Sequence, residues 1–279
     1  MTDQGRDLLT WIGDVCKVLG LESGETLVIN ARVEDKVLVT SVFGNATIQR
    51  NWNRLVLEEE LPFDRPILRE GESMIVPDKK YGELDADSAM VLKHWDEPPG
   101  CMVLEVGANE EDLASIFSEQ GYQVLGVDLR PWNAKLKNYV RMEGDFVTLA
   151  PFIKPWQFSV AVSTSAIEHF GLNVYGSPEV EDYDAQAMRE IFRLLHPGGR
   201  CYLTVPYGRE FKANGHWRVY CRKTLQERLI GQFNVEKKIF FKSGGCVCPD
   251  VDGIVEEKDA DEWSGDPPHV TVMLKLRKP

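Results

Sequence analysis

The stretch Cys101–Pro131, CMVLEVGANEEDLASIFSEQGYQVLGVDLRP, reads as a strand, a glycine turn, a helix and a second strand. Cys101–Val106 is a short apolar run, typical of a strand buried on both faces. Gly107 can turn the backbone tightly and approach a ligand closely. The second strand, Tyr122–Val127, ends at Asp128, where a carboxylate can accept hydrogen bonds from both hydroxyl groups of a ribose. The pattern therefore predicts a βαβ unit that binds a nucleoside.

The turn after Gly107 discriminates between kinds of nucleotide. Dinucleotide-binding units carry further glycines here, whereas this chain has Ala108 and Asn109, the expected N-cap of the helix. The acids Glu110–Asp112 then crowd the helix N-terminus, where a pyrophosphate needs positive potential. A ligand of little net charge that carries its own cation fits better. S-adenosylmethionine, with a sulfonium and a zwitterionic tail, meets that requirement.

Composition excludes several partners. The chain has 279 residues, a formal net charge of −12 and 43% hydrophobic residues, enough for one large α/β domain with an extension. The acidic balance argues against nucleic acid, which needs clustered Lys and Arg. No apolar run has membrane-spanning length, and the N-terminus lacks the order of a signal peptide. The six cysteines are scattered, which indicates reduced thiols in the cytoplasm.

Two regions are expected. Residues 1–84 predict a small α+β extension that caps the active site or mediates dimerisation, with a helix at Leu8–Leu19 and a hairpin of Thr26–Val33 and Lys36–Phe43. Residues 85–279 alternate helices and strands, which predicts a Rossmann-like doubly wound sheet, mostly parallel with an antiparallel last strand. An acidic surface insertion is expected at 246–267. The predicted helices are Asp85–Trp95, Asp184–Leu195 and Leu225–Ile230, and the later strands are Asn138–Met142, Gln157–Ser163, Arg200–Val205, Val235–Phe241 and His269–Leu276.

Four motifs follow one another in order: Leu104-Glu105-Val106-Gly107, Val127-Asp128, Gly144-Asp145-Phe146 and Leu194–Arg200, LLHPGGR. On these residues the chain resembles the class I S-adenosylmethionine-dependent methyltransferases over about residues 85–279. A narrower likeness, carried by Ser165–Leu172, SAIEHFGL, is to a small-molecule subgroup, many of whose members are associated with sugar or polysaccharide biosynthesis.

The resemblance implies S-adenosylmethionine as cofactor and a role for each matching residue. Gly107 would approach the methionine moiety and Glu105 would orient the loop or receive the ammonium group. Asp128 would hold the ribose, while Asp145 would either accept from the adenine amine or cap a helix. The full set of expected cofactor-binding residues is Glu105, Gly107, Ala108, Asp128, Leu129, Asp145, Phe146 and Ser163. No metal is expected, because Cys246 and Cys248 have no second ligand pair nearby.

Catalysis requires alignment of the acceptor and removal of its proton. His169 is the first candidate base and His216 the second, since a histidine suits deprotonation of a hydroxyl or an ammonium group. Tyr175, Tyr207 and Tyr220 are candidates to line the acceptor pocket. The expected reaction is methyl transfer to O or N of a small molecule, with a sugar-related acceptor one option. The alternatives are a catalytically silent methyltransferase-fold binding or regulatory protein, and an NAD- or nucleotide-sugar-binding enzyme.

Overall fold

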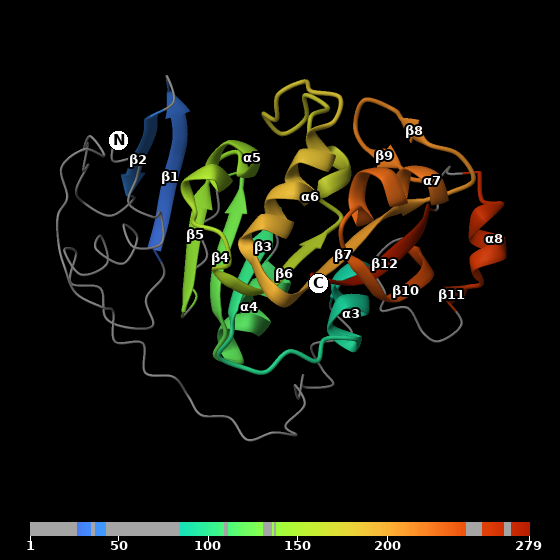
Figure 1. Ribbon diagram of the computed structural model, residues 1–279, viewed down its shortest axis with the longest axis horizontal. Coiled ribbons are helices and arrows are strands. Elements are labelled where there is room, and N and C mark those ends of the chain that lie inside the picture. Colours follow the sequence, from blue (N-terminus) through green and yellow to red (C-terminus); the bar gives the residue numbers. More distant parts are fainter. Residues whose placement is uncertain are drawn as a thin grey trace.

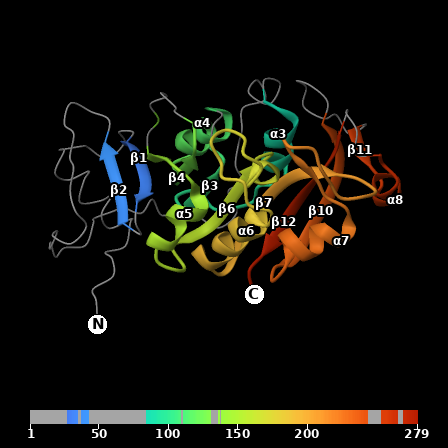
Figure 2. The same ribbon diagram turned by 90° about the horizontal axis from the view of Figure 1, so that it is seen from above.

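A ten-stranded mixed sheet forms the centre of the protein, in the order β11-β10-β12-β7-β6-β3-β4-β5-β1-β2 (Figures 1 and 2). The computed structural model describes residues 27–34, 37–42, 84–108, 111–130, 136, 138–243, 253–264 and 269–279. The strands and helices named for this fold all lie within these residues. The side chains of β1 and β2 lie outside this description.

Five neighbouring strands are parallel and build the expected nucleoside-binding layer. They are β3 (Met102–Val106), β4 (Gln123–Asp128), β5 (Tyr139–Glu143), β6 (Phe158–Thr164) and β7 (Leu195–Tyr207). The last strand, β12 (His269–Arg277), pairs antiparallel with both β7 and β10 (Asn234–Ser243). The predicted Rossmann-like sheet with an antiparallel last strand is confirmed, and that strand lies inside the sheet rather than at its edge.

The predicted hairpin near the N-terminus is present and joins the same sheet. β1 (Leu27–Glu34) and β2 (Val37–Val42) pair antiparallel, and β1 also pairs in parallel with β5. The two strands thus extend the edge that follows β5. The predicted helix at Leu8–Leu19 lies outside the described residues, and the division into domains at residue 84 stays a prediction.

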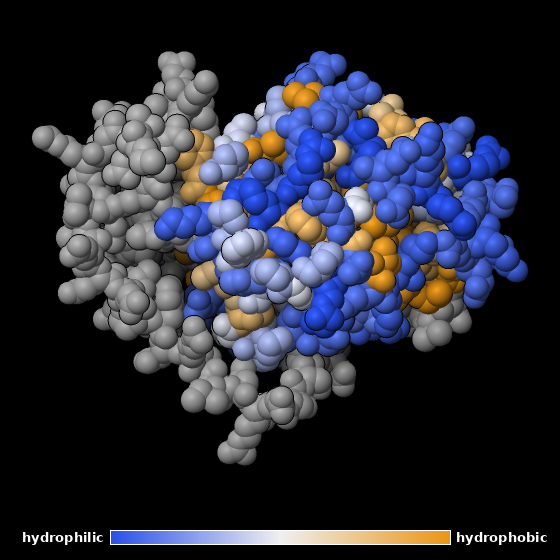
Figure 3. Space-filling model, in the orientation of Figure 1, coloured by the Kyte–Doolittle hydropathy of each residue, from blue (hydrophilic) through white to orange (hydrophobic). Residues whose placement is uncertain are grey.

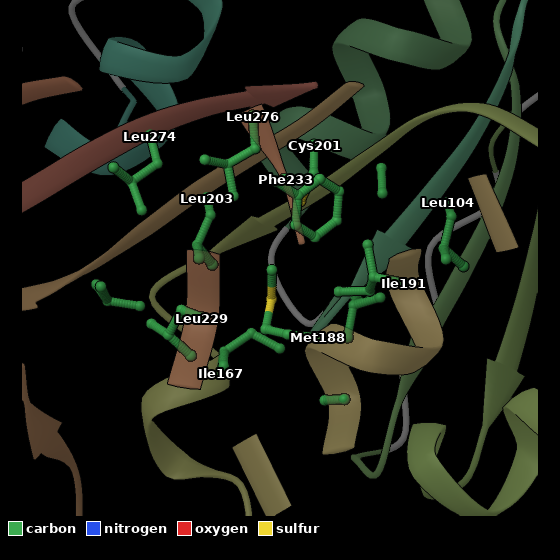
Figure 4. Packing of buried hydrophobic residues seen from close by; sticks show 14 of the residues in the cluster. Leu104, Ile167, Met188, Ile191, Cys201, Leu203, Leu229, Phe233, Leu274 and Leu276 are labelled. Atoms are coloured by element: carbon green, nitrogen blue, oxygen red, sulfur yellow. The ribbon is translucent and has the colours of Figure 1, made fainter. Parts of the chain in front are cut away.

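Helices cover both faces of the sheet, because its central strands are apolar on both sides. In β3, Val103 belongs to a core with α3 (Ala86–Lys93) and α4 (Glu111–Glu119), while its neighbour Leu104 belongs to a core on the opposite face (Figures 2 and 4). The opposite face is covered by α5 (Phe146–Leu149), α6 (Tyr183–Leu194) and the π-helix η4 (Leu225–Ile230), which directly follows the short α7 (Arg222–Thr224). Successive side chains of a strand point to opposite faces, so a parallel sheet covered on both faces needs apolar residues at consecutive positions.

The C-terminal part carries several short elements. β8 (Lys212–Ala213) and β9 (Arg218–Val219) pair as a separate two-stranded sheet, and β11 (Ile254–Val255) and α8 (Glu257–Asp261) lie in the described part of the predicted acidic insertion. The visible face in Figure 3 is mostly hydrophilic around scattered apolar patches. Among the described residues, no helix combines the length and apolar character needed to cross a membrane.

Candidate active site

A cavity of about 350 Å³ opens at the carboxyl ends of β3, β4, β5 and β6, the edge where open α/β sheets bind ligands. Seven of the predicted site residues line it: Glu105, Gly107, Asp128, Leu129, Asp145, Phe146 and His169. The described lining also contains residues that the sequence analysis did not select, namely Asp85, Asp87, Ser88, Arg130, Thr164, Ser165, Ala166 and Tyr183. Residues from distant parts of the chain thus meet at one edge of the sheet.

Gly107 directly follows β3 and turns the chain toward α4. Its φ is +83°, in the left-handed region that favours glycine. A Cβ atom here would lie 2.2 Å from the Cβ atom of Ala166, which follows β6. Glycine therefore lets the first turn pack directly against the segment that leads to His169.

Ala108 and Ser163 have places different from those expected. Ala108 is 1% exposed, and a Cβ atom on Gly126 of β4 would lie 3.0 Å from the Ala108 Cβ atom, so Ala108 packs against the sheet. Ser163 is 1% exposed, and neither residue lines the cavity. Side chains alternate along a strand, so the next residue, Thr164, lines the cavity instead. The cofactor role predicted for Ala108 and Ser163 therefore has no support from their position.

Glu105 is a buried carboxyl at the base of the cavity. The Tyr139 hydroxyl donates to Oε2 of Glu105 over 2.8 Å. Burial raises the pKa of Glu105 to about 7, while Tyr139 and Arg141 oppose that rise and Asp128 adds to it. An ammonium group beside Glu105 would favour the ionised form and bring the pKa back down. The residue is thus suited to receive a cation, as the resemblance implies.

Glu105 is expected to make stability fall as the pH rises. Its pKa is raised from an ordinary value of 4.5 to about 7, so the folded protein keeps a proton that the unfolded chain releases between these values. The free energy of unfolding should therefore decrease by about 3 kcal/mol across this window and be constant above it. Urea unfolding of the wild type and Glu105→Gln should give similar stabilities at pH 5 and a more stable variant at pH 8. The exposed Glu119→Gln on α4 is the matched control, and an equal difference at both pH values would contradict the assignment.

Asp128 ends β4 with its side chain almost fully buried, and a guanidinium group already occupies it. The Arg130 N–H and Nε donate to Oδ1 over 2.7 and 3.1 Å, and an Nη atom of Arg130 donates to Oδ2 over 3.1 Å. The fully buried Arg141 lies 4.0 Å from Oδ1. These cations stabilise a carboxylate at the position where the resemblance expects the ribose.

Asp145 caps α5, which was one of its two predicted roles. Its Oδ1 accepts from the N–H groups of Val147 and Thr148, and its Oδ2 accepts from the Tyr183 hydroxyl over 2.8 Å. Phe146, the first residue of α5, is buried and lines the cavity beside Asp145. Because the cap fixes the start of α5, the Asp145 carboxylate and the Phe146 ring keep their positions side by side in the cavity lining, where both could contact a planar base.

His169 lies in the short 3-10 helix η3 (Ile167–His169), and His216 orients it through its backbone. Nδ1 of His169 is 2.5 Å from the His216 carbonyl oxygen. Because a carbonyl only accepts, Nδ1 carries the proton, and Nε2 of the neutral ring is left with a lone pair. His216 does not line the cavity, so the second candidate base acts here as an orienting group.

Glu168 lies near Nε2 of the same ring. Its side chain is 1% exposed, and its Oε1 accepts from the Ser165 hydroxyl over 2.7 Å and lies 3.9 Å from Nε2 of His169. Burial raises the pKa of the Glu168 carboxyl, while His169 and Ser165 oppose that rise. The carboxylate would therefore stabilise the positive charge that His169 acquires on taking up a proton.

Two of the predicted pocket tyrosines point elsewhere. The Tyr207 hydroxyl donates to Asp261 and the Tyr220 hydroxyl to the buried Asp184. Both side chains are buried and neither lines the cavity, whereas Tyr175 does line it. The role predicted for Tyr207 and Tyr220 has no support from their position.

Arg218, two residues after His216, is buried and holds the segment after β6. Its guanidinium donates to the carbonyl groups of Glu168, Phe170 and Glu181. This fixes the backbone on both sides of His169. In the described residues no group of three or more His, Cys, Asp or Glu is arranged to hold a metal, and Cys246 and Cys248 lie outside the description.

Comparison with known proteins assigns the family. Residues 73–232, more than half of the chain, match the family described as "Methyltransferase domain". The chain belongs to this methyltransferase family. The resemblance to class I S-adenosylmethionine-dependent methyltransferases is thereby confirmed, and with it S-adenosylmethionine as the cofactor.

A search of curated proteins finds no match, whereas solved structures give distant ones. A 1,6-didemethyltoxoflavin N1-methyltransferase from Burkholderia thailandensis is 18% identical, with a TM-score of 0.47, and covers 69% of this chain and 76% of its own. A TehB-like methyltransferase from Corynebacterium glutamicum is 16% identical, with a TM-score of 0.44, and the match covers 71% of this chain and 89% of that protein. The [4+2]-cyclase SpnF is 16% identical, with a TM-score of 0.47, and the match covers 69% of this chain and 80% of SpnF. Similarity of this degree does not indicate what the methyltransferase acts on.

Proposed function

We propose that this methyltransferase transfers the methyl group of S-adenosylmethionine to an oxygen or nitrogen atom of a small molecule, with His169 as the base. The observation that carries the proposal is that His169 lines the same cavity as Gly107 and Asp128 while its Nδ1 contacts the His216 carbonyl, so Nε2 of the neutral ring is the nitrogen that can accept a proton. The predicted nucleoside-binding edge and a proton acceptor thus share one cavity. This is the arrangement that methyl transfer to a hydroxyl or amine requires.

Each part of the cavity suits one part of the cofactor. Asp128 would accept from the ribose hydroxyl groups, and Phe146 and Asp145 would contact the adenine. Glu105 would receive the ammonium group, which suits its buried carboxyl. When bound, S-adenosylmethionine supplies an electrophilic methyl group and leaves as S-adenosylhomocysteine. His169 would take the proton that the acceptor loses as its bond to the methyl group forms, and Glu168 would stabilise the resulting imidazolium.

Calorimetry with S-adenosylhomocysteine tests the cofactor site. We expect micromolar binding to the wild type and, for Asp128→Asn, a loss of about 10- to 100-fold, since an amide cannot accept from both ribose hydroxyl groups. Asp182→Asn on the exposed start of α6 is the control for a change of one charge and should bind normally. Binding of NADH in place of S-adenosylhomocysteine would contradict the proposal.

A screen of acceptors tests the reaction itself. Production of S-adenosylhomocysteine should be followed with hydroxyl and amine compounds, including sugars, because the likeness of Ser165–Leu172 suggests a sugar-related acceptor. Activity that requires His169 would support an O- or N-methyltransferase.

A catalytically silent binding protein is the second candidate. The observation that favours it is that the Arg130 guanidinium binds both oxygens of Asp128, the carboxylate expected to hold the ribose. Binding of S-adenosylhomocysteine without turnover of any acceptor, unchanged by His169→Ala, would support this candidate over the enzyme.

A further inference from the structure

Arg130 uses most of the hydrogen-bonding capacity that Asp128 has. Three hydrogen bonds run from Arg130 to the two carboxylate oxygens, one from its N–H and two from its guanidinium. A carboxylate offers about four lone-pair directions, so about one remains. A ribose diol needs two. The guanidinium and the ribose therefore cannot both be bound fully.

The side chain of Arg130 can leave while its backbone stays. The backbone N–H is bound to Asp128, and the backbone carbonyl accepts from the buried Arg141 over 2.9 Å. The Arg130 side chain is 35% exposed, whereas that of Asp128 is 6% exposed. A bound ribose would thus displace the guanidinium and leave the turn that carries it in place.

The Tyr175 ring can keep its contact with the guanidinium of Arg130 after that group leaves Asp128. The central carbon of the guanidinium already lies 4.7 Å from the centroid of the Tyr175 ring, within the range of a cation–π contact. That ring also meets the His169 ring edge-on, with centroids 5.4 Å apart. Tyr175 has a φ of +55°, rare for an aromatic residue, in a loop held by the bond from the Gly171 N–H to the Ser177 hydroxyl. The loop therefore holds an aromatic face between Arg130 and the candidate base.

We propose that Arg130 serves two partners in turn: it occupies Asp128 until the cofactor binds, and then, against Tyr175, it binds a carboxylate or phosphate group of the acceptor. This rests on the proposed function and adds to it the class of acceptor and the order of binding. A guanidinium stacked on an aromatic face with its donors free is well suited to bind such a group.

The described lining of the cavity carries five carboxyl side chains, those of Asp85, Asp87, Glu105, Asp128 and Asp145, so an anionic acceptor needs a cation that is free to bind it. Arg130 is the sole Arg or Lys among the described residues that line it. Asp85 and Asp145 each cap a helix, and their carboxylates accept from backbone N–H groups there. The helix N-termini offset these two negative charges. Once Asp128 holds the ribose, Arg130 is the free cation of the described lining, and it contacts the same Tyr175 ring that His169 contacts.

The first test is the affinity of S-adenosylhomocysteine for Arg130→Gln. Removal of the competing guanidinium should tighten binding roughly 3- to 10-fold, the effect of a partly exposed ion pair. Added salt should reduce the difference in S-adenosylhomocysteine affinity between Arg130→Gln and the wild type, since salt weakens the ion pair of Arg130 with Asp128 in the wild type. Arg189→Gln, which removes an equal charge at the exposed pair with Asp182, should leave the affinity unchanged. Weaker binding to Arg130→Gln would overturn the proposal, because Arg130 would then help to hold the cofactor.

The second test uses inorganic phosphate and acetate as probes at constant ionic strength. If either anion binds Arg130 only after the cofactor, linkage requires that it tighten the binding of S-adenosylhomocysteine. An anion with a Kd of about 10 mM would tighten it about 6-fold at about 50 mM. The two probes separate phosphate from carboxylate recognition. The effect should vanish in Arg130→Gln. No effect of either anion, or an equal effect in the variant, would overturn the inference, whereas failure of the wild type to bind S-adenosylhomocysteine would overturn the proposed function.

Discussion

Replacement of Gly107 by alanine is expected to abolish measurable binding of S-adenosylhomocysteine and to lower the free energy of unfolding by about 2–5 kcal/mol. The new Cβ atom would lie 2.2 Å from the Cβ atom of Ala166, and alanine would be held at a φ of +83°. Relief of the contact moves either the turn after β3 or the segment before His169, and both form the cavity wall. Calorimetry and urea unfolding measure the two effects.

Two further variants separate strain from the clash. Gly121→Ala places alanine at a similar φ of +79° with nothing within 4 Å of its Cβ atom, so it should lose only about 1–2 kcal/mol and keep its binding. The double variant Gly107→Ala, Ala166→Gly removes the Cβ–Cβ contact and should recover part of both losses. If Gly107→Ala behaves like Gly121→Ala, the close approach of the two segments is not needed for binding.

Replacement of His169 by asparagine is expected to lower kcat by about 10²- to 10⁴-fold with an acceptor found in the screen, the usual loss when a general base is removed. The affinity for S-adenosylhomocysteine should change little, because the expected contacts to the cofactor come from other residues. In the wild type, ¹⁵N NMR of the neutral His169 ring should show the proton on Nδ1, where the His216 carbonyl accepts it.

His216→Ala is the matched control for this prediction. His216 contributes its backbone carbonyl to the site, and alanine keeps that group, so activity should stay within a few-fold of the wild type. A large loss in His216→Ala with full activity in His169→Asn would reverse the two roles. The sequence placed both histidines as alternatives, whereas in the structure they act together.

Local pattern was sufficient for most of the fold. The apolar runs predicted β3, β4, β6 and β12 to within a few residues, and the hairpin near Val33 was also predicted from sequence. Pairs of residues close in sequence could be interpreted as well: Asp145 was expected either to cap a helix or to face the ligand, and it does cap α5. The contributions of Asp85 and Ser88 to the cavity were missed, since nothing in the pattern before α3 reveals which strand ends the helix will face.

The sequence alone determined the nucleoside-binding unit, because Gly107 and Asp128 belong to one βαβ segment whose geometry is local. It also determined the family, through motifs that keep their order along the chain. Only the tertiary structure decided how the site is assembled. The contact of Gly107 with Ala166 and the orientation of His169 by His216 join residues 47 or more positions apart. Such contacts depend on the order of strands and the direction of side chains, which periodicity along the chain does not encode.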